Sequence, residues 1–487
     1  MIGSSALGMA TVALAKAAPM EHLTGRRQAV FERFAQATRY YEPLPHTLAA
    51  LSLADRVEVR TLLVGGREFV ATRVQDEDIL GRIPRVRNQM RYKGGIRMMP
   101  NAGPAKAAEL ALEMSLKTAV VAPPLTHTAL VAETILMGGG KATIMADPKT
   151  FDEETRMEIG RRFVREFFFM LADGNGNPID CPAPDVNTDG KLMAVMTDEY
   201  NRIAGRSVWE CFTGKPLELG GCAGRPEATG RGLTIVVDRL LRNGLVEGMK
   251  GLAGQSVAID GFGNVGTFAA EVMIEYGARV MAWSDSRGAV KSSAEGGFTA
   301  RQIREFIARK EDEKRQGGTL IERNLSRKDL VGLDVDVLVL GAPDLTLTGD
   351  AKKVRDDSNG PYSADSVRAK VVAEGGNGMT DEEGDAVLAG KGVVVAPDIL
   401  ANAGGVIVSG FEIVQNRGWH QLGPGEDRRW WTRERTNGLL AEQLVAATDA
   451  VSGYVRRHGI SVRDAAMVKA MVSLDEGFRR LRAGDSG

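Results

Sequence analysis

The sequence predicts an α/β protein, and three observations support that prediction. An apolar run at residues 257–259 leads into Gly261, Gly263 and Gly266 and then into helical spacing at 267–276, which is the order strand, tight turn, helix. The first third of the chain mixes helical and strand patterns, which indicates a second part with a mixed sheet. Three short apolar runs are each followed by Gly, Pro or Asn, as expected of parallel strands: residues 335–340, 371–374 and 392–395.

The composition describes a globular chain without a strong charge bias. Of the 487 residues, 43% are hydrophobic, and 62 basic residues balance 63 acidic ones. This length predicts two or three domains, and the balanced charge argues against a nucleic-acid or membrane-surface protein. The apolar stretch at 6–18 contains Lys16 and has no basic region before it, so we expect no signal peptide. No run is long enough to span a membrane, and we expect a cytoplasmic protein.

Three cysteines indicate a reducing compartment. Cys181, Cys211 and Cys222 are odd in number, lack C-x-x-C spacing and have no histidine cluster nearby. We interpret them as packed thiols and predict no metal site.

The regular elements follow from hydrophobic spacing. Residues 57–64 alternate and connect through Gly65 and Gly66 to a second strand at 68–74. The prolines within residues 181–188 predict a stiff loop. Helical spacing recurs in four segments: residues 26–39, 105–116, 152–171 and 464–474. The charged stretch 309–315 is interpreted as a solvated surface segment.

The glycine pattern has a physical basis in dinucleotide binding. The first glycine permits the turn, the second lets a pyrophosphate approach the backbone, and the third lets helix and strand pack closely. The helix N-terminus offers unpaired N–H groups to the phosphates. We therefore expect five residues to contact the cofactor: Gly261, Gly263, Asn264, Val265 and Gly266.

Asp285 is the expected partner of the cofactor ribose. It ends the apolar run at 280–283, about twenty residues past the last glycine, where a carboxylate accepts hydrogen bonds from the ribose hydroxyls of NAD. Neighbouring serine and arginine side chains also suit a 2′-phosphate, namely Arg279, Ser284, Ser286 and Arg287. NAD is therefore the expected cofactor, and NADP is possible.

Three lysines near glycines, together with Asp185, form a candidate catalytic set. Glycine lets backbone and substrate come close, and a lysine held in a partly dry cleft beside other cations loses proton affinity, as a general base at neutral pH requires. The lysines are Lys93, Lys117 and Lys141. Lysines are more often solvated surface charges and Gly-Gly more often marks a loop, so chemistry alone leaves both interpretations open.

Seven motifs resemble, in the same order, those of the glutamate dehydrogenase family within the larger group of Glu/Leu/Phe/Val dehydrogenases. The similarity covers the chain from about Arg60 to the C-terminus. The motifs are KGGIR, CPAPDVNT, MTDEY, TGKPLELGG, EATGRG, GFGNVG and PDILANAGGVIVSGFEIVQN.

The resemblance implies a discontinuous substrate domain with a mixed sheet, a Rossmann-type dinucleotide-binding domain and a cleft between them. In that cleft an L-amino acid would be oxidatively deaminated to its 2-oxo acid. The implied boundaries are 1–222 for a substrate and oligomerisation domain, completed by C-terminal helices at 405–487, and 223–404 for the dinucleotide domain. A homo-oligomer, specifically a hexamer, is also implied.

The resemblance assigns roles by motif. Lys93 would bind the side-chain carboxylate of the substrate with a hydrogen bond from Ser409, and Lys117 would hold the α-carboxylate. Lys141 would activate the water that attacks the iminium, and Asp185 would move protons to and from the amine. Three residues would lie at the cofactor: Thr229, Asn377 and, near the nicotinamide, Asn402. Taken alone, the two asparagines are equally typical of turns, and the serine of a helix position.

Two segments depart from the family pattern. Lys117 and Lys141 are further apart than in the family, and the extra segment is residues 124–136, while a second insertion at 76–91 precedes Lys93. The motif GGGKAT is closer to the leucine and phenylalanine branch, whereas Lys93 favours the glutamate branch. We expect reversible deamination of L-glutamate to 2-oxoglutarate and ammonia. The alternatives are a dehydrogenase of another L-amino acid with a remodelled pocket, and a non-catalytic regulatory paralogue.

Overall fold

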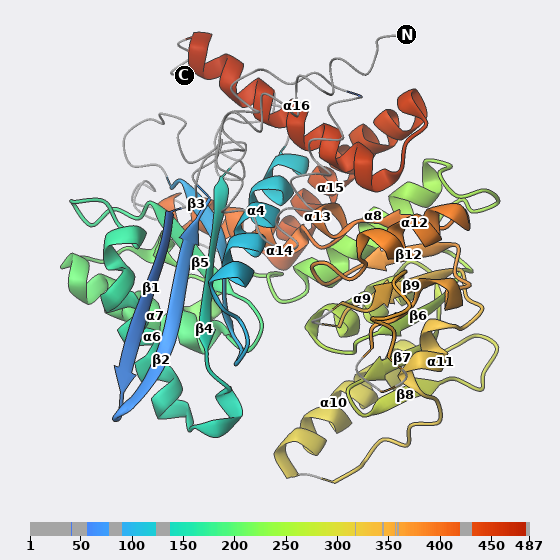
Figure 1. Ribbon diagram of the computed structural model, residues 1–487, viewed down its shortest axis with the longest axis horizontal. Coiled ribbons are helices and arrows are strands. Elements are labelled where there is room, and N and C mark those ends of the chain that lie inside the picture. The colour runs from blue at the N-terminus through green and yellow to red at the C-terminus, as the bar shows by residue number, and fades with distance from the viewer. Residues whose placement is uncertain are drawn as a thin grey trace. The chain divides into compact units, whose positions relative to one another are not determined.

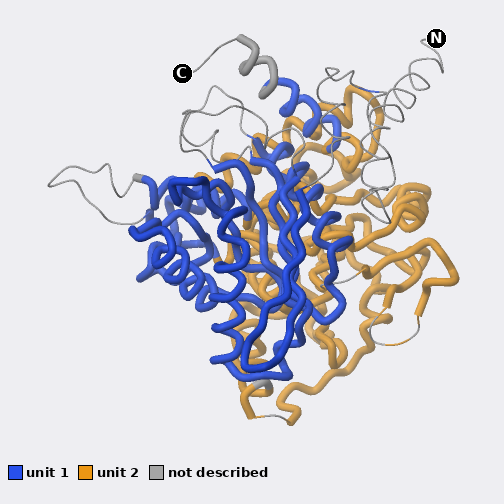
Figure 2. The backbone as a smooth tube through the Cα atoms, turned by 60° about the vertical axis from the view of Figure 1, so that its left-hand side comes forward, with its two compact units in different colours: residues 1–225, 406–438, 467–487 blue, residues 226–405, 439–466 orange. Residues whose placement is uncertain are grey.

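The chain forms two compact units, shown in Figure 2. Unit 1 comprises residues 1–225, 406–438 and 467–487, and unit 2 comprises 226–405 and 439–466. The computed structural model describes Tyr40 and residues 56–76, 90–122, 137–316, 318–342, 345–355, 357, 360–418 and 431–483. The predicted helix at 26–39, the insertion at 124–136 and most of the insertion at 76–91 lie outside these residues.

Unit 1 is built on a mixed five-stranded sheet in the order β1-β2-β4-β3-β5 (Figure 1). The predicted hairpin is confirmed, because β1 and β2 pair antiparallel through Gly65 and Gly66. β2 also pairs antiparallel with β4, while β3 runs parallel to β4 and β5. The strands are β1 (Arg56–Val64), β2 (Arg67–Gln75), β3 (Tyr92–Met98), β4 (Gly138–Met145) and β5 (Asp180–Pro184).

Helices α6 and α7 cover one face of this sheet. Apolar side chains of both helices share a core with the strand residues Ile96, Met98, Ala142 and Ile144. Asp152 and Asp189 cap the two helices by accepting hydrogen bonds from the backbone N–H groups of the first turn. The helices of this unit include α4 (Pro104–Val120), α6 (Glu153–Leu171), α7 (Gly190–Ala204) and most of α14 (Gly404–Gly418).

Helix α4 covers the opposite face. A Cβ built on Gly139 of β4 would lie 1.7 Å from the carbonyl oxygen of Ala111 in α4, so only glycine lets the helix lie this close. Side chains alternate along a strand, and Ile96 and Ala142 point toward α6 and α7. The neighbouring charged residues of β3 and β4 therefore point toward the α4 side.

The segment 181–188 was predicted to be a loop, and its first part is strand β5 instead. Among the described strands, β5 lies at the edge of the sheet and pairs with β3 alone. Pro182 and Pro184 are compatible with that position, because a proline at a sheet edge does not interrupt a ladder of hydrogen bonds on both sides.

Unit 2 contains a six-stranded sheet in the order β13-β12-β9-β6-β7-β8, parallel except for the antiparallel β8. The chain runs outward from β6 through β7 and then returns to β9 on the other side. The carboxyl ends of β6 and β9 therefore form a topological switch point, the usual place for a dinucleotide. The strands are β6 (Ser256–Asp260), β7 (Arg279–Asp285), β8 (Gly288–Lys291), β9 (Val337–Leu340), β12 (Val371–Glu374) and β13 (Val394–Ala396), with the short pair β10 (Leu347–Thr348) and β11 (Tyr362–Ser363).

The helices of unit 2 flank this sheet and include most of α15. They are α8 (Ala228–Arg242), α9 (Asn264–Glu275), α10 (Ala300–Gln316), α11 (Arg327–Val331), α12 (Glu382–Gly390), α13 (Asp398–Ala401), α15 (Arg433–His458) and the first turn of α16 (Val462–Ala483). Within the described ranges, no helix combines the length and apolar composition needed to cross a membrane.

The C-terminal helices do not all belong to the unit that the sequence assigned to them. Residues 439–466 cluster with unit 2, whereas the prediction placed all of 405–487 in the substrate domain. The reason is packing on α8: Arg239 of α8 forms an ion pair with Asp449 of α15, with 2.5 Å between Nε and Oδ1.

Candidate functional site

Charged residues from β3, from β4 and from the position directly after β5 meet on the α4 side of unit 1. Arg97 of β3 donates a hydrogen bond from Nε to Oδ2 of Asp185 at 2.7 Å, and Nζ of Lys141 in β4 lies 3.2 Å from the same oxygen. Gly95 makes room for this cluster, because a Cβ there would lie 2.7 Å from Cβ of Asp185. The structure thus brings Lys141 and Asp185 together, and it adds Arg97, which the sequence did not single out.

Burial gives Lys141 a lowered pKa. The residue is 2% exposed, and loss of solvation lowers its pKa to about 8, with the charges of Arg97 and Lys117 acting in the same direction and Asp185 opposing them. A lysine with this pKa has a useful neutral fraction near neutral pH, as a general base requires. Lys117 itself is buried in the last turn of α4.

Asp185 remains ionised in this setting. Burial alone would raise the pKa of its carboxyl, but the charges of Lys141 and Arg97 outweigh burial and hold the pKa well below its usual range. Because both cations contact Oδ2, the carboxylate has a fixed orientation.

Lys93 is a second buried ammonium. It is 1% exposed, and its Nζ donates to the carbonyl oxygen of Cys181 at 3.0 Å. Burial lowers its pKa to about 8; Cys181 opposes this shift and the charge of Arg225 adds to it. No carboxylate of the described chain lies within ion-pair distance of Lys93. The charges of Glu412 and Asp180 also raise the pKa of Lys93, but from beyond ion-pair distance. A buried cation without a directly paired carboxylate is costly, so this position favours an anionic ligand.

Ser409 lies on α14, and its hydroxyl accepts a hydrogen bond from Nε of Arg225 at 3.1 Å. Arg225 is a second residue that sequence reasoning missed. The signal available was a lone arginine in the small-residue segment GCAGRPEATG, directly before the motif that contains Thr229. Burial lowers the pKa of Arg225, which places another desolvated cation near Lys93.

The glycine loop of unit 2 fits the pyrophosphate of a dinucleotide. Gly261 has φ +102° and its Cβ would lie 2.5 Å from backbone atoms of Gly341, while a Cβ on Gly266 would lie 2.0 Å from the carbonyl oxygen of Gly261. Gly263, by contrast, has no atom within 4 Å of its Cβ position. The first and third glycines therefore serve the turn and the packing, and the second faces open space.

Helix α9 begins directly after this loop. Asn264 and Val265 form its first turn, and Gly263 at the N-cap provides no side-chain acceptor. The N–H groups of this turn are the groups that bind phosphates in such loops.

The buried carboxylate of Asp260 stabilises the glycine loop. Ser284 donates from Oγ to Oδ1 of Asp260 at 2.7 Å and accepts from the N–H of Gly261 at 3.2 Å. Arg327 donates from Nη2 to Oδ2 of Asp260 at 2.8 Å. These long-range contacts hold the turn between β6 and α9.

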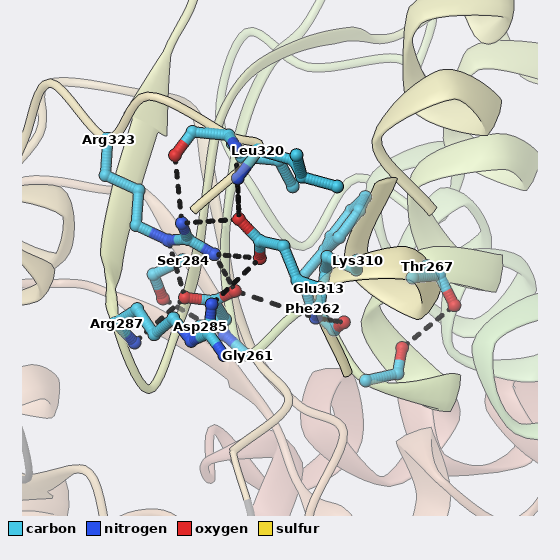
Figure 3. Close-up of polar contacts among 12 residues, drawn as sticks. Gly261, Phe262, Thr267, Ser284, Asp285, Arg287, Lys310, Glu313, Leu320 and Arg323 are labelled. Atoms are coloured by element: carbon cyan, nitrogen blue, oxygen red, sulfur yellow. Dashed lines mark hydrogen bonds and ion pairs between the residues drawn. The ribbon is translucent and has the colours of Figure 1, made fainter. Parts of the chain in front are cut away.

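Asp285 lies at the end of β7, as predicted, but it is engaged in ion pairs (Figure 3). Arg323 binds it through two hydrogen bonds, from Nε to Oδ1 at 3.0 Å and from Nη2 to Oδ2 at 2.7 Å. Arg323 also reaches Glu313 on α10, with 3.1 Å between Nη2 and Oε2. The prediction that 309–315 is a solvated segment is therefore wrong for Glu313, which is buried by this contact.

Asn377 and Asn402 lie together at the carboxyl ends of β12 and β13. Nδ2 of Asn402 donates to Oδ1 of Asn377 at 2.9 Å and to the carbonyl oxygen of Gly376 at 3.0 Å. Oδ1 of Asn402 is buried and has no hydrogen-bond partner in the part of the chain that the structure describes. Thr229, in the first turn of α8, is half-buried.

One buried arginine connects the loops that carry these asparagines. Arg463 of α16 forms ion pairs with Glu374 at 2.9 Å and Asp385 at 2.9 Å, and lies 3.6 Å from Asp398. Asp398 in turn accepts a hydrogen bond from the N–H of Gly378 at 2.8 Å. The arginine thus stabilises both loops from the side of α16.

Comparison with known proteins identifies the family of the chain. The dimerisation domain of Glu/Leu/Phe/Val dehydrogenases matches residues 85–202, and the Glutamate/Leucine/Phenylalanine/Valine dehydrogenase domain matches residues 220–480. An NADP(+)-dependent glutamate dehydrogenase of Pyrobaculum calidifontis is 34% identical over 83% of this chain and 84% of its own length. An NAD-specific glutamate dehydrogenase of Peptoniphilus asaccharolyticus is 32% identical over 79% and 82%.

A solved structure gives the same result. The hetero-hexameric glutamate dehydrogenase of Thermus thermophilus, in its Leu-bound form, superimposes with a TM-score of 0.76 at 27% identity and covers 93% of this chain and 96% of that chain. The predicted fold class is confirmed by this similarity. The chain is an NAD(P)-dependent amino acid dehydrogenase that belongs to the Glutamate/Leucine/Phenylalanine/Valine dehydrogenase family.

Proposed function

We propose that the protein catalyses the reversible oxidative deamination of L-glutamate to 2-oxoglutarate and ammonia with NAD or NADP. The observation that carries this proposal is the buried ammonium of Lys93, which has no carboxylate partner among the described residues. Glutamate would supply that partner through its side-chain carboxylate, whereas leucine or valine would leave the charge uncompensated. Relatives named glutamate dehydrogenase support the same substrate.

The other site residues suit the remaining groups of the substrate. Ser409 offers a hydroxyl for the side-chain carboxylate, and Lys117 provides the charge for the α-carboxylate. Arg225 is a further candidate for the side-chain carboxylate, because its charge reaches Lys93 and its Nε holds the serine hydroxyl.

Lys141 and Asp185 handle protons in the proposed reaction. When bound, NAD(P) supplies the two-electron acceptor for the substrate Cα. Neutral Lys141 takes a proton from the water that attacks the iminium carbon. In that state the charge of Lys141 no longer lowers the pKa of Asp185, and Asp185 accepts and returns protons of the amine. Arg97 orients Asp185 throughout, because its hydrogen bond to Oδ2 remains when Lys141 loses its charge.

In unit 2, the proposed cofactor contacts are the N–H groups of Gly263, Asn264 and Val265 for the pyrophosphate. The buried Oδ1 of Asn402 suits the carboxamide of the nicotinamide, which has an N–H donor. Thr229 and Asn377 complete the proposed cofactor site.

We also propose a homo-hexamer, supported by the hexameric relative of Thermus thermophilus. Light scattering coupled to size-exclusion chromatography would give a mass about six times that of the 52.3 kDa chain. A cytoplasmic location remains a prediction from the sequence.

A spectrophotometric assay tests the proposed function. Purified protein is incubated with NAD or NADP and a panel of glutamate, leucine, norvaline, methionine, phenylalanine and valine, and reduced cofactor is followed. Glutamate should give the highest kcat/KM. Higher kcat/KM with an apolar amino acid would favour the remodelled-pocket alternative, and no turnover with any of them would favour the regulatory paralogue. The relative of Thermus thermophilus binds leucine in its solved structure, so the glutamate reaction is also measured with leucine added.

A further inference from the structure

The carboxylate expected to bind the cofactor ribose has little acceptor capacity left. Oδ1 of Asp285 accepts from Nε of Arg323 at 3.0 Å and from the backbone N–H of Arg287 at 2.9 Å. Oδ2 accepts from Nη2 of Arg323 at 2.7 Å and faces Nζ of Lys310 at 3.9 Å. A carboxylate offers about four lone-pair positions, and here three are used and the fourth faces an ammonium.

The surroundings of Asp285 carry a net positive charge. Among the side chains that the structure describes here, three cations, Arg287, Lys310 and Arg323, lie among two carboxylates, Asp285 and Glu313, which leaves one positive charge in excess within this group (Figure 3). An acidic residue selects against NADP by repelling its 2′-phosphate, and a carboxylate neutralised in this way no longer does so.

The cations are held by the glycine loop and by α10. Lys310 donates a hydrogen bond to the carbonyl oxygen of Phe262, the residue that follows Gly261, and its ammonium lies 5.4 Å from the centre of the Phe262 ring. Arg287 donates from Nη1 to the carbonyl oxygen of Gly318 at 2.8 Å, and its side chain is 45% exposed. Both cations are thus positioned beside the end of β7, where the adenosine ribose lies in a Rossmann-type domain.

We propose that unit 2 recognises the 2′-phosphate of NADP, and that Arg323 determines this specificity by neutralising Asp285. Lys310 and Arg287 are the phosphate contacts. The inference rests on the proposed dehydrogenase function for the use that the protein makes of NADP. The binding itself concerns the adenosine part of the cofactor and can be measured without turnover.

Binding of cofactor fragments tests the proposal without any turnover. Isothermal titration calorimetry is performed on the full-length protein with ADP-ribose and with 2′-phospho-ADP-ribose, which lack the nicotinamide. The wild type should bind 2′-phospho-ADP-ribose at least as tightly as ADP-ribose. Arg323→Ala frees a carboxylate that repels phosphate, so the ratio of the two affinities should fall about ten- to a hundredfold, the worth of one charge-assisted hydrogen bond. Arg323→Lys, which keeps the charge, should retain most of the ratio.

Arg301→Gln is the matched control, because Arg301 lies on α10, the helix that carries Lys310 and Glu313, is 86% exposed and pairs only with Glu305 among the described residues. The proposal is overturned if the wild type binds ADP-ribose more tightly than 2′-phospho-ADP-ribose, or if folded Arg323→Ala keeps the wild-type ratio. If Arg323→Ala does not fold, Arg287→Gln is used instead, because Arg287 is exposed and is a proposed phosphate contact. The ratio of the affinities for the two fragments must then fall several-fold, and an unchanged ratio overturns the proposal. Normal fragment binding without glutamate turnover would contradict the proposed function alone.

Discussion

Two lysines of unit 1 and three ion pairs of unit 2 illustrate two different uses of charge. In unit 1, Lys93 and Lys141 are buried ammonium groups with pKa values lowered to about 8 by loss of solvation. In unit 2, three carboxylates are held in ion pairs with arginines: Asp260 with Arg327, Asp285 with Arg323, and Glu374 with Arg463. Unit 1 contains structural pairs of this kind too, Arg73 with Asp180 and Lys215 with Glu412.

The lysines with a lowered pKa can take part in a reaction, whereas the ion pairs stabilise the conformation of loops. An ammonium with few partners exchanges its proton near neutral pH and binds an incoming anion, which suits a substrate site. A carboxylate paired with an arginine does neither, because the guanidinium keeps its proton. Such a pair stabilises the loops around it, and removing one partner leaves a costly unpaired charge. The following predictions test the contrast, from the largest expected effect to the smallest.

Lys141→Ala tests most directly whether a lysine of unit 1 takes part in the reaction. Turnover should fall by about a hundred- to ten-thousandfold, the usual effect of removing a positioned acid or base. Cofactor binding, followed by calorimetry, should stay close to wild type, because Lys141 belongs to unit 1. Wild-type turnover in this variant would remove Lys141 from the mechanism.

Arg463→Ala tests whether the ion pairs of unit 2 stabilise the fold. It leaves Glu374, Asp385 and Asp398 without their shared cation, and the free energy of unfolding should fall by about 3–5 kcal/mol. Urea denaturation followed by circular dichroism measures this value. Arg456→Ala is the control, because Arg456 lies on an exposed face of α15 and its described contact is one hydrogen bond to the carbonyl oxygen of Asn243. A loss below about 1 kcal/mol in Arg463→Ala would show that these pairs do not stabilise the loops.

Lys93→Leu tests the identity of the substrate. Removing the cation should lower kcat/KM for glutamate by about a hundredfold, the effect of losing one charge-assisted contact in a dry site, and should affect norvaline or methionine much less. Initial rates with the three amino acids give the comparison. An equal loss for all three would mean that Lys93 supports the fold of the site and does not bind a carboxylate.

The smallest effect concerns pH. Lys141 acts when neutral, so kcat/KM for glutamate should rise as pH approaches about 8, whereas Lys93 binds as a cation, so kcat/KM should fall above about 8. The profile for glutamate is therefore expected to be a narrow bell centred near pH 8. In Lys93→Leu with norvaline, the falling limb should disappear, and its persistence would assign it to another group.

Sequence reasoning predicted the parts of the molecule that depend on local patterns. The hairpin around Gly65 and the turn at Gly261 follow from alternation and glycine spacing, which act over a few residues. Helical periodicity likewise predicted helices at 105–116, 152–171, 267–276 and 464–474, and α4, α6, α9 and α16 lie there. Lys141 and Asp185 were expected at one site, and the structure brings them into contact.

The arginines were not predictable in this way. Arg97, Arg323 and Arg463 find their partners 88, 38 and 78 positions away in the sequence, and no local pattern encodes such pairs. Pro182 and Pro184 were misleading for a related reason: proline usually marks a loop, and only the sheet order shows that this segment lies at an edge.

The glycines around the lysines limit how this site could be redesigned. A Cβ on Gly94 or Gly139 would lie 1.7 Å from a backbone oxygen, and one on Gly95 would displace Asp185. Backbone atoms cannot move aside as a flexible side chain would, so a mutant library at these positions should contain almost no functional members. Directed evolution toward other amino acid substrates would have to vary side chains such as Lys93 and Ser409, while the backbone around the glycines stays unchanged.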